Sequence, residues 1–98
     1  MYASASYGSI IPGSGQVVAI GAGSLASTAL NSHNGTARVT STVDCFIEFG
    51  GSGQTPVAVA NTGAFMTANS TEYFEVTKGG KIAVIQSVGA GSLYISLL

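Results

Sequence analysis

Two side chains in this sequence of 98 residues could act together as a nucleophile and a base, Cys45 and His33. Such a pair works when the imidazole takes the thiol proton across a hydrogen bond. His33 lies in the polar stretch NSHNGT, whereas Cys45 lies in an alternating stretch on the side that should face a core. A thiol in apolar surroundings has a raised pKa and behaves as a small hydrophobic side chain. The pattern therefore predicts no catalytic dyad, and a single cysteine leaves no internal disulfide.

The acidic residues do not form a catalytic pair either. Glu72 and Glu75 are three positions apart, so on a strand they point to opposite faces. Asp44 and Glu48 share a face but lie about 13 Å apart along it, too far for the carboxylates of a retaining glycosidase. The usual spacings of metal ligands are also missing. We therefore expect a protein that is not an enzyme and holds no cofactor or metal ion.

The stretch QVVAIGAGSLA (16–26) has the glycine spacing of a dinucleotide-binding turn. In that motif, G-x-G-x-x-G/A, the glycines join a strand to a helix whose N-terminus holds the pyrophosphate. Gly21, Gly23 and Ala26 match the spacing, but SLASTALNSHNGT reaches Asn34-Gly35 before a helix of about ten residues is complete. The β-rich segment ARVTSTV follows. The glycines therefore predict a chain reversal between strands.

Charge is scarce, at 7% of residues against roughly 25% in an average soluble domain. Three basic residues cannot line a phosphate backbone, so we expect no nucleic-acid partner. Apolar runs stay well short of the roughly 18 residues that span a bilayer, and the start lacks the regions of a secretory signal. We expect no membrane partner and synthesis in the cytoplasm. Sparse charge gives little repulsion between copies, which favours a homo-oligomer.

The elements that must position any site are strands. From residue 16 onward, short β-type runs alternate with Gly and Asn, and long windows with a helical period are missing. The expected strands cover residues 16–20, 25–30, 37–49 (bent or broken near Val43), 55–60, 64–67, 72–77, 81–87 and 92–97.

The alternation also predicts the core. In VDCFIEFG and SLYISLL every second residue is apolar, while KIAVIQ is apolar on both faces and is expected to be covered twice or to lie at a subunit contact. The predicted core residues are Val43, Cys45, Ile47, Phe49, Ile82, Val84, Leu93, Ile95 and Leu97. About eight short antiparallel strands predict an all-β fold, a small sandwich or jelly-roll-like barrel. This domain spans residues 16–98.

Residues 1–15 are rich in Ser, Gly and Ala and predict a flexible N-terminal arm. Several apolar side chains lie in this arm or on strand faces that should be wet. Together they favour a partner-binding surface, since single exposed apolar residues are common but groups of them are not. The predicted partner-binding residues are Tyr2, Tyr7, Ile10, Ile11, Phe46, Tyr94 and Leu98.

The segments ARVTSTVDCFIEFG (37–50) and TGAFMTANSTEYFEVTKGGKIAVI (62–85) resemble small virion β-proteins of tailed bacteriophages, of the head decoration or cement type. The likeness covers most of residues 16–98 and lies in strand pattern and turn placement. It transfers no catalytic residue. The resemblance implies a compact β-sandwich, commonly a homotrimer, that sits on the capsid surface of the virion and clamps neighbouring copies of the major capsid protein.

Two other functions remain open. The same jelly-roll plan occurs in other phage virion components, such as fibre or head-binding modules. A lectin-like or cupin-like carbohydrate-binding module is the alternative from another class. It would form its pocket from loops such as 50–55 and 61–63 and would need an aromatic platform or a metal triad there.

Overall fold

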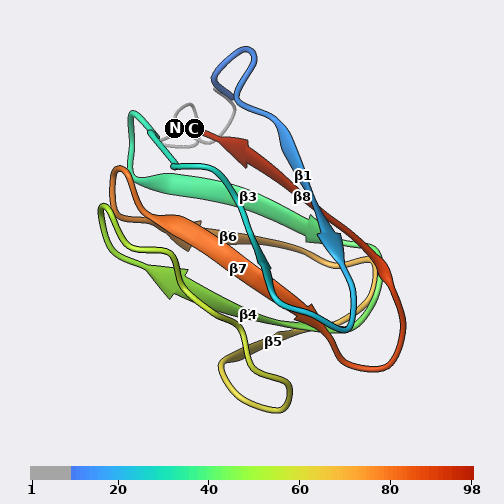
Figure 1. Ribbon diagram of the computed structural model, residues 1–98. Coiled ribbons are helices and arrows are strands. Elements are labelled where there is room, and N and C mark those ends of the chain that lie inside the picture. The colour runs from blue at the N-terminus through green and yellow to red at the C-terminus, as the bar shows by residue number, and fades with distance from the viewer. Residues whose placement is uncertain (1–9) are drawn as a thin grey trace.

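A computed structural model describes residues 10–98 as two four-stranded antiparallel sheets that pack face to face (Figure 1). This confirms the all-β sandwich. The order in the first sheet, sheet A, is β1-β8-β3-β6, and in the second, sheet B, β2-β7-β4-β5. The strands are β1 (Gln16–Ile20), β2 (Leu25–Ala26), β3 (Thr36–Ser41), β4 (Cys45–Gly50), β5 (Ala64–Met66), β6 (Thr71–Glu75), β7 (Lys81–Gln86) and β8 (Gly91–Leu97).

The connectivity is that of a rolled hairpin. Strands β1 to β4 pair in turn with β8, β7, β6 and β5, so the chain doubles back on itself between β4 and β5. Two further pairings, β3 with β8 and β4 with β7, close the roll into two sheets. This is the jelly-roll arrangement of eight strands, which viral capsid domains, lectins and cupins share. The topology therefore leaves the function open.

The long strand expected over 37–49 is broken near Val43, as the sequence indicated. Residues 42–44 leave sheet A and enter sheet B, so that β3 and β4 lie in different layers. The corner is held by backbone hydrogen bonds between Ser41 and the chain before β6, from Ser41 N to Ser70 O and from Asn69 N to Ser41 O. The Asp44 carboxylate accepts a further bond, 2.7 Å long, from the Ala68 N–H.

The core lies between the sheets and contains most of the predicted residues. Cys45, Ile47, Ile82, Val84, Leu93, Ile95 and Leu97 are buried. Val43 is half-buried against the core. The prediction for Phe49 is wrong: its side chain is 38% exposed. The residue lies near the end of β4, where its ring packs on Phe74 with a centroid distance of 5.2 Å.

The expected strand over 55–60 is also wrong. This segment is extended but pairs with no strand. It runs from Gly50 on β4, against which Pro56 packs, to Ser24 beside β2, whose hydroxyl accepts the Ala58 N–H. It therefore crosses β7, which lies between them, and Ala83 is fully buried although it points outward from that strand. The double coverage expected for KIAVIQ is thus supplied by the chain itself at Ala83.

Part of the expected arm is attached to the sandwich. The Ile11 N–H donates to the Leu97 carbonyl, 2.8 Å away, and the Ile11 side chain packs against the core. The Ser14 hydroxyl accepts the Leu97 N–H. The chain therefore joins the domain at Ile11 instead of Gln16, because it continues the pairing of β1 with β8. Residues 1–9 of the expected arm lie outside the described residues.

Candidate functional site

The structure gives the candidate nucleophile no access to a substrate. Cys45 is fully buried, and burial raises the pKa of its thiol above the usual value, with the nearby Asp44 charge adding to the rise. A hydrogen bond with Ser41 acts in the opposite direction. His33 lies exposed in the loop before β3. Among residues 10–98, no group of three His, Cys, Asp or Glu side chains could hold a metal ion.

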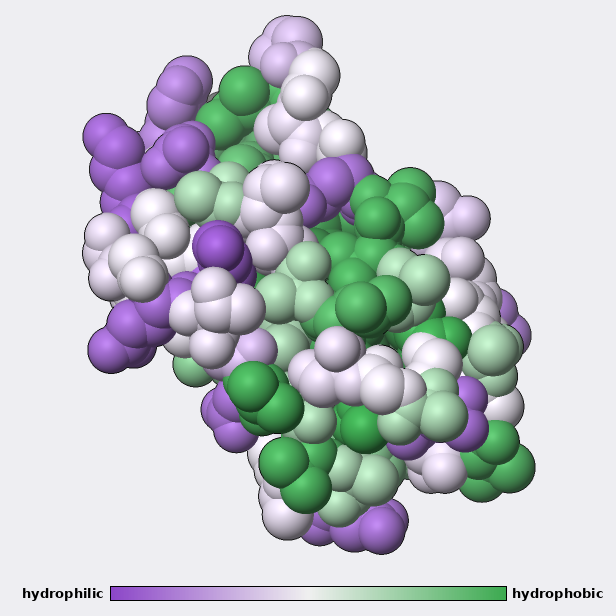
Figure 2. Space-filling view, viewed as in Figure 1, coloured by the Kyte–Doolittle hydropathy of each residue, from purple (hydrophilic) through white to green (hydrophobic). Residues whose placement is uncertain are grey.

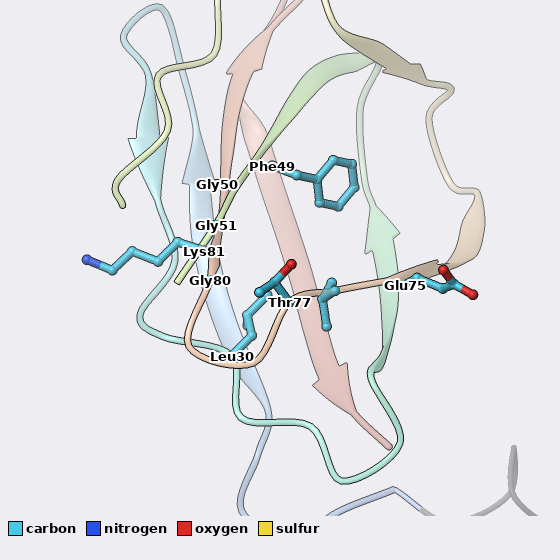
Figure 3. Close-up of a pocket in the computed structure, with 9 residues that line it drawn as sticks. Leu30, Phe49, Gly50, Gly51, Glu75, Thr77, Gly80 and Lys81 are labelled. Carbon is cyan, nitrogen blue, oxygen red and sulfur yellow. The ribbon is translucent and has the colours of Figure 1, made fainter. Parts of the chain in front are cut away.

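A hollow of about 170 Å³ opens at the end of the sandwich where β4 and β6 end and β7 begins. Leu30, Phe49 and Val76 line it together with backbone of several glycines. The two charged residues at its border, Glu75 and Lys81, point away from it on opposite sides (Figure 3). The Lys81 ammonium instead donates to the Thr55 hydroxyl, 3.1 Å away. The hollow thus brings no charged groups together for chemistry.

The loops of a lectin-like pocket do not meet there either. Gly50 and Gly51 line the hollow, whereas residues 61–63 do not. Gly63 lies instead beside the Ile47 carbonyl on β4. The aromatic ring nearest the hollow, Phe49, leans on Phe74 between the sheets and offers no open platform.

The predicted partner-binding residues separate onto different surfaces. Phe46 points outward from sheet B and Tyr94 outward from sheet A, on opposite sides of the molecule. Ile10 is exposed beside the end of β8, while Tyr2 and Tyr7 lie outside the described residues. Ile11 is half-buried in the domain, as described above. The predicted residues therefore do not form one site.

The expectation that Leu98 faces outward is wrong. Its side chain is 1% exposed, and its N–H donates to the Thr36 carbonyl. Its own carbonyl accepts bonds from the Asn34 N–H and the buried Ser32 hydroxyl. Leu98 follows Leu97 off the end of β8, so strict alternation no longer applies, and the loop over 32–36 closes around it.

The outer side of sheet A, here called the tyrosine face, carries aromatic, hydroxyl and β-branched residues in rows across four strands. Val17, Tyr94, Thr40 and Thr71 form one row. Ser96, Arg38 and Tyr73 form the next. Tyr94 and Tyr73 are 48% and 50% exposed. Tyr and Arg are the residues most enriched where proteins bind partners.

The outer side of sheet B is more apolar. Phe46 packs on Phe65 with a centroid distance of 5.2 Å, and Ile85 lies beside Phe46 on β7. The segment over 55–60 adds Val57 and Val59, both more than half exposed. We call these five residues the apolar face. Figure 2 shows apolar side chains along the middle of the view and at its lower end, near β5.

The sequence missed most of these surface residues. Val57 and Val59 were assigned to a strand that does not exist, although their alternation with Pro56 and Ala58 was a real signal of a segment lying flat on a surface. Tyr73 and Phe65 lie on short edge strands. Such strands contain too few residues for their alternation to distinguish the outer side from the inner side.

Comparison with protein-family models, with curated proteins and with solved structures finds no match for this chain. The part of the chain that the structure describes contains no helix able to cross a membrane.

Proposed function

We propose that this protein is a non-enzymatic structural protein of a phage virion, which binds the outer surface of the capsid and stabilises it. The observation that carries the proposal is the tyrosine face: a broad sheet surface rich in hydroxyl groups, with Tyr94, Tyr73 and Arg38 within two adjacent rows. Such a surface fits a protein partner better than a small substrate, which needs a concave site.

Three further observations support this function. The jelly roll is a fold of viral capsid domains, and the segments 37–50 and 62–85 resemble head decoration proteins. The single cysteine, which was the candidate nucleophile of the Cys45–His33 pair, is buried. With 7% charged residues the surface relies on apolar and hydroxyl contacts, which salt screens little. The partner is then the major capsid protein, and the place of action is the virion surface.

The proposal is tested on purified particles. Mass spectrometry of particles should find this chain in many copies, and particles made without it should rupture at a lower temperature. Added back, the full chain should bind these particles and restore their stability. A chain absent from particles, or particles equally robust without it, would show that the proposal is wrong.

Variants then locate the binding surface. Arg38→Glu and Tyr94→Asp should weaken attachment about tenfold or more, since the first reverses a charge and the second introduces one where a partner residue packs. Val88→Asp is the matched control, because Val88 is 87% exposed on the turn between β7 and β8 and belongs to neither face. Equal attachment of all three variants would refute the assignment of the tyrosine face. Thermal melts establish that each variant is folded.

A further inference from the structure

The apolar face has one acid and one base beside it. Glu48 and Lys81 both point outward from sheet B, opposite Ala83 and Gly50 in the strand register. Within residues 10–98 the Glu48 carboxylate accepts the N–H of its neighbour Phe49, and the Lys81 ammonium donates to the Thr55 hydroxyl. Neither forms an ion pair with another residue of the described chain. The face therefore combines apolar residues with one negative and one positive group that lie in the two rows next to Phe46 and Ile85.

We propose that a second copy of this chain covers the apolar face in a two-fold contact. In a two-fold contact, if residue i of one copy meets residue j of the other, then residue j of the first copy also meets residue i of the second. With the axis between the two charged groups, Glu48 of each copy faces Lys81 of the other. The net charge of the two groups is zero, so the contact needs no counter-charge from another molecule.

The composition of the two sheet faces supports this division of roles. Interfaces between identical subunits are more apolar than interfaces with exchangeable partners. The apolar face fits the first kind, whereas the outer side of sheet A, with its hydroxyl groups and Arg38, is the more polar of the two surfaces. The inference concerns a different surface from the proposed capsid contact and stands without it.

The molecule is large enough for such a contact. Its two longer dimensions are 39 and 29 Å, an outline larger than the roughly 800 Å² that a stable interface buries on each partner. When the same face of two copies packs together, both faces are covered and no third copy can join through them. The contact therefore predicts a dimer, in place of the trimer that the resemblance implies.

The mass of the isolated full chain tests the inference. Light scattering and sedimentation should give a dimer in concentrated solution and a monomer on dilution. Val57→Asp and Val59→Asp should each weaken dimerisation about tenfold or more, because the contact would bury an unpaired charge. The control Val88→Asp should dimerise like the unchanged chain. A monomer at every concentration, a trimer, or unimpaired dimerisation of both face variants would each overturn the inference.

Charge reversal tests the pairing itself. Glu48→Lys leaves two positive groups on the face and Lys81→Glu leaves two negative groups, so each variant alone should dimerise about tenfold more weakly. Mixed together, the two variants should form a heterodimer, in which every facing pair is again opposite in sign. Failure of the mixture to associate while the unchanged chain dimerises would refute the Glu48–Lys81 pairing. Because no particle is present, these results are independent of any failure to bind capsids.

Discussion

At the scale of single residues, burial decides what the few chemically active side chains do. Cys45 is the first residue of β4 and belongs to the buried core, next to Met66 on β5 in the strand register. Removing a thiol from water disfavours the thiolate, and this is the main cause of its raised pKa. The residue that looked most reactive in the sequence thus serves as core packing.

The raised pKa of Cys45 predicts how stability depends on pH. The folded chain prefers the neutral thiol, so this contribution is fully present below the ordinary thiol pKa of 9.0 and is lost as the pH rises through the folded value. We expect the free energy of unfolding to fall more steeply above pH 9.0 in the unchanged chain than in Cys45→Ala. Urea unfolding across this pH range measures both slopes, and parallel slopes would contradict the prediction.

Native labelling gives a second readout for the same residue. A thiol reagent should modify Cys45 slowly in the folded chain and rapidly in urea, because the thiol is inaccessible until the sheets separate. Rapid modification in the native state would show that the core is open at β4.

At the scale of elements, close backbone packing holds the start of β7 in place. A Cβ atom at Gly80 would collide with the Gly50 carbonyl oxygen on β4 and lie 3.0 Å from the Thr77 carbonyl oxygen. Gly80 also forms an isolated bridge with Leu30. Two rigid backbone segments therefore meet where only glycine fits.

Gly80→Ala should lower the free energy of unfolding by about 1–3 kcal/mol, the usual cost of forcing extra volume into a packed region. Gly89→Ala is the matched control, since a Cβ atom at Gly89 meets nothing within 4 Å. Chemical unfolding of the two variants beside the unchanged chain measures the difference. Equal stability of both variants would mean that the strands separate there without cost.

At the scale of the whole molecule, the N-terminal segment divides at Ile11. Residues from Ile11 onward are tied to β8, through Leu97 in particular. A shortened chain that lacks residues 1–9 keeps every contact described here. One that lacks residues 1–12 loses the packing of Ile11 against the core.

We therefore expect the second truncation to be less stable than the first by about 1–2 kcal/mol, in keeping with the partial burial of one isoleucine. Urea unfolding of the two shortened chains measures the difference. Circular dichroism should show β structure without helix in all three chains. If the two truncations were equally stable, Ile11 would add nothing to the domain.

Alternation along the strands and the placement of turn residues were enough to predict the fold class and most of the core. The alternation in VDCFIEFG and SLYISLL correctly identified Cys45, Ile47 and Ile95 as inward-facing, because a strand with one buried face must repeat every two residues. The break near Val43 could also be predicted, because the β-type segment over 37–49 is longer than most single strands. The absence of a helical period excluded the dinucleotide-binding fold.

Which apolar residues share a surface depends on the sheet to which each strand belongs. Phe46 and Tyr94 gave the same signal in the sequence, yet they lie on opposite sides of the molecule because β4 and β8 belong to different sheets. Leu98 was expected to face outward but is buried beneath the loop over 32–36. Phe49 was expected in the core but is partly exposed. Alternation along a strand distinguishes its two sides. Which side is covered depends on segments that are distant in the sequence and become neighbours only in the folded chain.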